Sequence, residues 1–142
     1  MTSNFAMRSP VELALAQARE AQPSWAATPL ATRLRSIHAL RDLIAVHATA
    51  IAKRAGDRVS EILVAQVLPL ADACRFLERN SRELIAPRRL GRCGRPWWLC
   101  GVESQIVREP FGVVLIVAPA NYPLFLPGVP LLQALVAGNA VL

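Results

Sequence analysis

This 142-residue sequence has few cysteines, and its first residues lack the features of a secretion signal. It has three cysteines, and residues 1–10 contain no apolar stretch of the kind that forms a signal peptide. An odd number of cysteines without such a signal favours reduced thiols over disulfide bonds. We therefore expect a cytoplasmic protein.

Acidic residues are also few. Ten Asp and Glu stand against sixteen Lys and Arg, all of them Arg except Lys53, and the net charge is +6. An excess of arginine suggests nucleic acid or an anionic membrane as a partner. The arginines are spread along the chain, however, and cluster only at Arg88, Arg89, Arg92 and Arg95. We favour a solvated basic surface, and keep a salt-dependent nucleic-acid site as an alternative.

Charge of either sign is absent from Pro110 to Leu142, a stretch long enough to cross a bilayer. Prolines recur within it at positions 119, 123, 127 and 130. Each would remove a helical hydrogen bond and clash with the preceding turn, at about 3 kcal/mol in a helix interior. A buried strand, turn and helix therefore fit this stretch better than a membrane span.

Apolar residues make up 54% of the chain and charged residues 18%, which excludes a disordered protein. The length suits one domain with a core of its own. We find no internal repeat and no low-complexity tract. The sequence nevertheless divides into a helical region at 9–85, a linker at 86–100 rich in Pro, Gly and Arg, and a strand-containing region at 101–142.

The first predicted helix begins at a capping box. Ser9 and Glu12 have the spacing of that motif, and Pro10 stands at the first helical position. We expect the helix to run to about Ala21 and Pro23 to close it.

Two longer helices are predicted next. Thr28-Pro29 repeats the start signal, and Gly56 is a suitable stop for the second helix. The apolar face of that helix consists of Leu30, Leu34, Ile37, Ile44 and Ile51, with Leu40 and Leu43 beside it. The third helix is expected from about Ser60 to Leu84, with a kink or restart at Pro69. Cys74 lies on its apolar side and is expected in the core.

The last third of the chain reads as strands around one helix. Residues 102–108 alternate like a half-exposed strand, and Val113 to Val117 form an apolar run typical of a strand buried on both faces. A loop rich in proline follows, then a short helix over Val129 to Ala137, and Ala140 to Leu142 begin a second buried strand. Two such strands lack neighbours on their outer edges, so we expect partners that cover them.

Three segments, in order and spacing, resemble the aldehyde dehydrogenase family. Residues 108–114 fit R-x-P-x-G-V-V, residues 119–123 fit P-[WFSA]-N-[FY]-P, and residues 134–141 fit A-L-x-A-G-N-A-V. The segment from Gln22 to Arg33 also resembles the family's opening helices, so the resemblance covers nearly the whole chain. It implies an α/β fold: N-terminal helices and the start of a doubly wound, Rossmann-like cofactor domain, with residues 102–109 as one arm of an oligomerisation extension.

The resemblance also implies a chemistry. In the family, a cysteine thiolate attacks the aldehyde, a hydride passes to NAD or NADP, and a glutamate activates the water that hydrolyses the thioester. Asn121 matches the asparagine that donates its side-chain N–H to the developing oxyanion. Val117, Ala118, Pro119 and Ala120 match the segment whose backbone lines the cofactor, although many members have an aromatic residue in place of Ala120.

In the family, the nucleophilic cysteine, the general-base glutamate and the glycine-rich cofactor turn come later in the sequence than the segment that matches Leu142. None of the three cysteines fits the nucleophile, because all precede Asn121. We therefore expect a fragment that is inactive alone and belongs to an enzyme for small-molecule aldehydes, as a homo-oligomer or in association with a full-length relative. The alternative is a non-catalytic interaction module.

No metal site is expected: zinc held by His38, His47, Cys93 and Cys100 is the weaker interpretation. Trp97 and Trp98 are expected to pack the linker against the helices.

Overall fold

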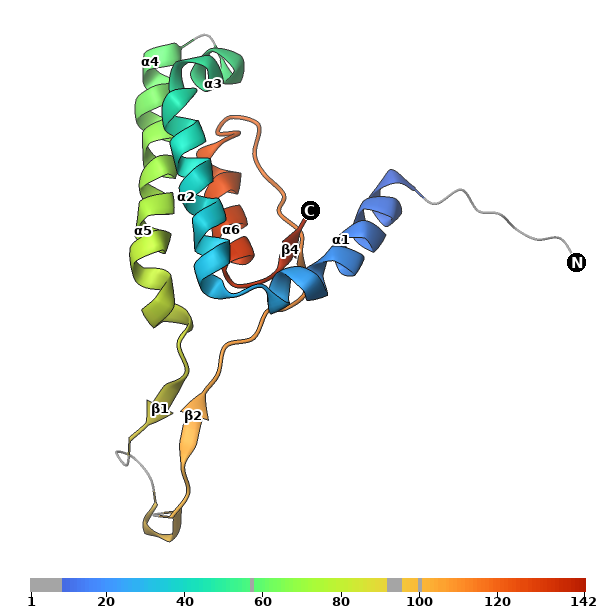
Figure 1. Ribbon diagram of the computed structural model, residues 1–142. Helices are drawn as coiled ribbons and strands as arrows, with labels where there is room; N and C mark the ends of the chain where they lie inside the picture. The colour runs from blue at the N-terminus through green and yellow to red at the C-terminus, as the bar shows by residue number, and fades with distance from the viewer. Residues whose placement is uncertain (1–8, 57, 92–95, 100) are drawn as a thin grey trace, which may run out of the picture.

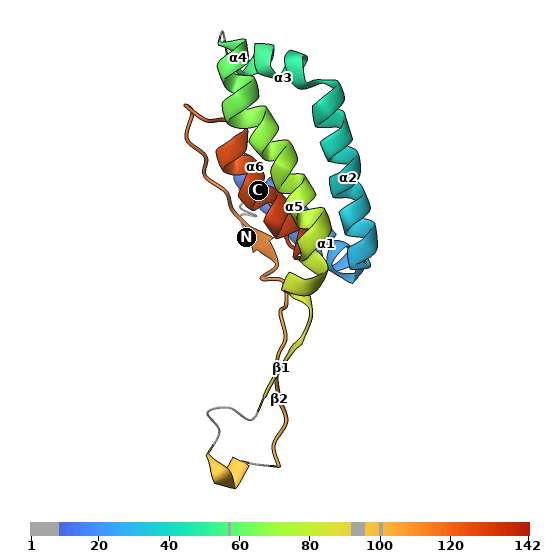
Figure 2. The same ribbon diagram turned by 90° about the vertical axis from the view of Figure 1, so that its left-hand side faces the viewer.

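The computed structural model describes residues 9–56, 58–91, 96–99 and 101–142. Helices form the body, a short parallel strand pair lies beside them, and a two-stranded arm extends away (Figures 1 and 2). The helical elements are α1 Pro10–Ala27, α2 Leu30–Val46, α3 Ala48–Ala55, α4 Val59–Ile62, the π-helix η1 Leu63–Val67, α5 Leu68–Ile85, the 3₁₀ turn η2 Trp97–Leu99 and α6 Phe125–Val136. The strands are β1 Arg88–Leu90, β2 Ser104–Ile106, β3 Val113–Val114 and β4 Ala140–Val141.

Helix α1 begins as predicted and ends later. The Ser9 hydroxyl accepts from the Glu12 amide, and the Glu12 carboxylate accepts from the Ser9 amide, which completes the capping box. The prediction that Pro23 closes the helix was wrong, because α1 continues to Ala27 with Pro23 inside it. The turns on either side of the proline are held by tertiary bonds: Trp25 donates to Leu135 in the last turn of α6, and Gln22 donates to Gly138 just after that helix.

The second predicted helix is divided in two. Helix α2 ends at Val46, His47 leaves the helical geometry with φ −102° and ψ 12°, and α3 resumes at Ala48. Gly56 ends α3 as expected, in an extended conformation. Leu34, Ile37 and Ile44 are buried on the predicted face, whereas 56% of Leu43 is exposed.

The predicted break at Pro69 is present and takes the form of a π-helical turn. Proline has no N–H, so it cannot donate to the carbonyl group four residues earlier, that of Ala65. The turn widens just before it, and the Leu68 amide donates to the Leu63 oxygen, five residues back. Helix α5 then restarts with Pro69 in its first turn, where the missing donor costs nothing.

The arm consists of β1 and β2, paired antiparallel with Leu90 opposite Ser104. Strand β1 falls inside the segment interpreted as a linker, and β2 occupies residues 104–106 of the strand expected over 102–108. The prediction that the two tryptophans pack against the helices was wrong: Trp97 is 81% and Trp98 67% exposed. Their rings meet edge to face, with centroids 5.8 Å apart.

Strands β3 and β4 pair in parallel, and α6 connects them in the sequence, as in a βαβ unit. The expectation that residues 113–117 are buried on both faces was wrong for this chain: Leu115 is 68% and Val117 85% exposed. Helix α6 begins at Phe125 rather than Val129, with Pro130 in its interior. The core lies between α2, α5 and α6, where Ile37, Cys74 and Leu132 are almost fully buried.

Candidate functional site

The candidate site is the loop between β3 and α6, at the carboxyl end of the first parallel strand. In open α/β sheets, ligands bind outside this end of the strands. The structure places Val117, Ala118, Pro119, Ala120 and Asn121 consecutively on this loop, all exposed. Within the part of the chain that the structure describes, the Asn121 side chain makes no hydrogen bond, so its amide N–H groups are available to an acceptor.

The strand before the loop is held to the end of α6 by Asn139. Its side-chain oxygen accepts from the Gly112 amide at 3.0 Å, and its Nδ2 donates to the Ala134 oxygen at 3.1 Å. Asn139 is only 3% exposed, so these bonds are shielded from water. The start of β3 is therefore fixed relative to the helix that the loop leads into.

A second attachment joins α1 and α2 to the turn between α6 and β4. Gln22 Nε2 donates to the Gly138 oxygen at 3.1 Å, and Trp25 Nε1 donates to the Leu135 oxygen at 2.8 Å. Gly138 has φ +94°, and a Cβ there would collide with the guanidinium group of Arg33. Arg33 is 8% exposed, and burial lowers its pKa.

The far end of the loop is attached to the π-helical turn. The amide of Leu124 donates to Oε1 of Gln66 at 3.1 Å, and Gln66 is only 5% exposed. Leu124 also packs its side chain against the helical core. The loop that carries Asn121 is thus tied down at both ends.

Beside the loop lies a hollow of about 220 Å³. It is lined by Ala55, Gly56, Arg58, Glu61, Ile62, Ala65, Gln66, Asn121 and Tyr122. Arg58 and Glu61 form an exposed ion pair at its edge, with 3.2 Å between Nη1 and Oε2. The residues at this site can donate neutral hydrogen bonds and offer exposed loop backbone, but they include no nucleophilic thiol.

Cys74, the cysteine that the structure describes, lies in the core with 0% exposure. Burial raises the pKa of its thiol, and the nearby Glu78 raises it further. A buried, protonated thiol is inert as a nucleophile, which agrees with its predicted core role. Cys93 and Cys100 lie outside the described residues, as do Arg92 and Arg95 of the basic cluster.

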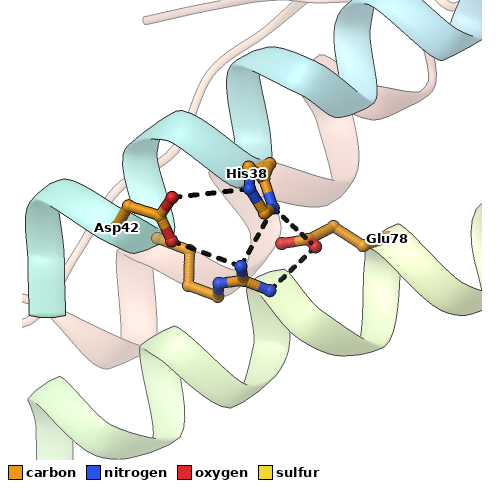
Figure 3. A network of polar contacts seen from close by, with 4 residues as sticks. His38, Asp42 and Glu78 are labelled. Atoms are coloured by element: carbon orange, nitrogen blue, oxygen red, sulfur yellow. Dashed lines mark hydrogen bonds and ion pairs between the residues drawn. The ribbon is translucent and has the colours of Figure 1, made fainter.

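A polar network joins α2 and α5 away from this loop (Figure 3). Arg41 donates to Glu78 at 2.8 Å, and His38 Nδ1 lies 3.1 Å from the same carboxylate. Asp42 contacts both His38 and Arg41. None of these side chains lines the hollow beside Asn121, so we assign the network to helix packing.

Neither a metal site nor a membrane span is found among the described residues. No three His, Cys, Asp or Glu side chains gather there in a way that could hold an ion. No described helix is both long and apolar enough to cross a bilayer.

Sequence reasoning missed Gln66, Asn139 as a strand anchor, and Arg33. Asn139 stands in the matched segment 134–141, but the pattern alone does not reveal what its side chain bonds. Gln66 has no local signal, because its partner is 58 residues away. Pro69 is the nearby clue, since it marks the irregular turn that bears Gln66.

Helices packed on an opening β–α–β unit, with an exposed loop after the first strand, place the chain in the open α/β class of folds. The family model described as "Aldehyde dehydrogenase family" matches residues 2–142. The chain therefore belongs to the aldehyde dehydrogenase family, which confirms the resemblance and the predicted fold class.

Several relatives share this region. The chain is 30% identical over 135 residues to N-succinylglutamate 5-semialdehyde dehydrogenase of Novosphingobium aromaticivorans, covering 92% of this chain and 27% of that protein. Among solved structures it is similar to PnpE from Pseudomonas sp. WBC-3, at 27% identity and a TM-score of 0.78, covering 92% and 26%. It also resembles NADP-dependent glyceraldehyde-3-phosphate dehydrogenase from Bacillus halodurans in complex with NADP, at 26% identity and a TM-score of 0.74, covering 90% and 27%. The chain spans about a quarter of the length of these proteins.

Proposed function

We propose that this chain supplies the oxyanion donor and part of the cofactor-binding backbone for the NAD(P)-dependent oxidation of an aldehyde to a carboxylic acid. The observation that carries the proposal is the placement of Asn121. It lies on an exposed loop at the carboxyl end of β3, with its side-chain amide unpaired among the described residues, in a segment that matches the family pattern.

Asn121 would act by donating a hydrogen bond to the aldehyde oxygen as negative charge grows on it. A neutral amide suits this role, because it stabilises the charge without a proton transfer of its own. The nucleophile and the general base would come from other parts of the assembled enzyme, so the 142 residues alone would show no turnover.

The backbone from Val117 to Ala120 would line the cofactor. Exposed backbone at the carboxyl end of a parallel strand is where open α/β domains bind dinucleotides, and Ala118 and Ala120 leave it accessible. NAD or NADP would supply the hydride acceptor when bound. The relative from Bacillus halodurans, which was solved with NADP, supports this cofactor class.

A second candidate function is that of a non-catalytic module that pairs with a full-length relative or with another copy. The exposed apolar side chains at the strand pair favour it: Phe111 is 96%, Val117 85% and Leu115 68% exposed. Light scattering separates the two functions. A chain that stays monomeric with and without the relative would leave this candidate without support.

The experiment that tests the proposed function is a dehydrogenase assay on the gene product, expressed through its full reading frame. NAD and NADP are each supplied with a panel of aldehydes, and reduced cofactor and carboxylic acid are both measured. We expect the two products in equal amounts. We expect no turnover from residues 1–142 expressed alone, in the same cytoplasmic expression host. A gene product without aldehyde oxidation, or a 142-residue chain with robust turnover, would overturn the proposal.

A further inference from the structure

The backbone at the start of α6 needs a hydrogen-bond acceptor that its own sequence does not supply. The first N–H groups of any helix have no partner within the helix. In α6 the N-cap residue is Leu124, whose side chain cannot accept a hydrogen bond, and no side-chain cap is formed locally. An acceptor must therefore come from elsewhere in the fold or from water.

Gln66 supplies that acceptor from the π-helical turn. Its Oε1 accepts from the Leu124 amide at 3.1 Å, and the residue is only 5% exposed, so water competes little for the bond. A π-turn contains one more residue than a regular α-helical turn. With a regular turn, the side chains of η1 would point in different directions relative to α5. The wide turn before Pro69 bears Gln66, whose Oε1 reaches the Leu124 amide.

A fixed Leu124 amide restricts the position of Asn121. Only Tyr122 and Pro123 separate the two residues. Proline has a locked φ, and the residue before a proline is biased toward extended conformations. Few backbone torsions therefore remain free between them. Gln66 and Asn121 also line the same hollow, so the anchor and the anchored residue belong to one site.

We propose that Gln66 is a positioning residue for Asn121: through its bond to the Leu124 amide it holds the loop that presents the oxyanion donor. The catalytic meaning of this inference rests on the proposed function. The anchoring itself is a property of this chain, and it can be measured without aldehyde or cofactor.

The test uses the ¹⁵N-labelled 142-residue chain and three variants. Gln66→Met removes the acceptor and keeps the side-chain length, Gln66→Glu keeps an acceptor oxygen, and Gln133→Met makes the same change at an exposed site on α6. Amide hydrogen exchange is followed at Leu124 and, as a core reference, at Leu77. The backbone amide resonance of Asn121 reports the state of the loop.

In Gln66→Met we expect exchange protection at Leu124 to fall roughly tenfold, the value of one net hydrogen bond, while protection at Leu77 is unchanged. The backbone amide resonance of Asn121 should move toward its unfolded-chain position. Gln133→Met should match the unchanged protein, and Gln66→Glu should retain protection at Leu124, because a carboxylate oxygen can still accept the bond. A Gln66→Met variant that matches Gln133→Met at Leu124 and Asn121, or one that loses protection equally at Leu77, would overturn the inference.

If Gln66→Met does not fold, amide exchange at Leu124 in the unmodified chain is the test. A Leu124 amide that exchanges at the unprotected rate in that protein contradicts the bond, and strong protection supports it. The two proposals also fail in distinguishable ways. Absent turnover with a protected Leu124 counts against the proposed function, whereas turnover with an unprotected Leu124 counts against the positioning role.

Discussion

At Gly138, both the backbone conformation and a close tertiary contact disfavour any residue with a side chain. It has φ +94°, and the space that a side chain would need is occupied by the Arg33 guanidinium group, with the Ala26 backbone nearby. Gly112 has a similar φ of +110°, but nothing lies within 4 Å of its Cβ position. The two glycines therefore separate the cost of the backbone conformation from the cost of the contact.

We predict that Gly112→Ala lowers the free energy of unfolding by about 1–2 kcal/mol, because only the backbone conformation is disfavoured. Gly138→Ala should lower it by a further ~1–3 kcal/mol, since the methyl group must also displace Arg33. Urea denaturation of the two variants measures the difference. Equal losses would show that Arg33 does not pack against Gly138.

The sequence predicted those parts of the candidate site that form one continuous segment of the chain. Asn121 and residues 117–120 lie together on one loop because they are consecutive, and the family pattern identifies them. Their roles in catalysis and cofactor binding remain predictions. Gln66, Arg33 and Asn139 were not predictable as anchors, because each makes contacts that depend on how distant elements pack.

At the scale of elements, Pro69 illustrates how one residue shapes a site on another segment. The sequence predicted an interruption there, and the structure resolves it as a π-turn that carries a buried Gln66. Pro69→Ala restores the missing N–H, so a regular α-helix becomes the favoured backbone. A regular helix would rotate Gln66 away from the Leu124 amide.

We predict that Pro69→Ala lowers exchange protection at Leu124, roughly tenfold, while the helix itself becomes no less stable. Hydrogen exchange at Leu124 and the thermal unfolding midpoint provide the two readouts. Pro130→Ala, a second helical proline in α6, is the matched control and should leave the π-turn intact. A Pro69→Ala variant with full Leu124 protection would show that Gln66 is placed by packing rather than by the wide turn.

The helix boundaries show where local signals are outweighed. Pro23 predicted an end that the fold overrides, because the bonds from Gln22 and Trp25 hold the following turn against α6. The division at His47 and the early start of α6 at Phe125 likewise have no clear local signal. Element type was therefore predictable along most of the chain, and element ends depended on tertiary contacts.

At the scale of the whole molecule, the apolar segment that follows β3 leaves large side chains exposed. An apolar run that reads as a buried strand is instead open to solvent at Leu115 and Val117, because a parallel strand needs neighbours and covering helices to be buried. The sequence predicted this need for partners. The chain spans about a quarter of the length of its relatives, which is consistent with cover that comes from other segments.

The kinetics of an Asn121→Ala variant test the central claim most directly. The gene product, expressed through its full reading frame, is compared with this variant and with Asn80→Ala, a control on α5. The account predicts that loss of the oxyanion donor lowers kcat by about 10²–10³-fold, whereas Asn80→Ala leaves it unchanged. An Asn121→Ala enzyme that retains the kcat and kcat/KM of the unmodified protein would contradict the account.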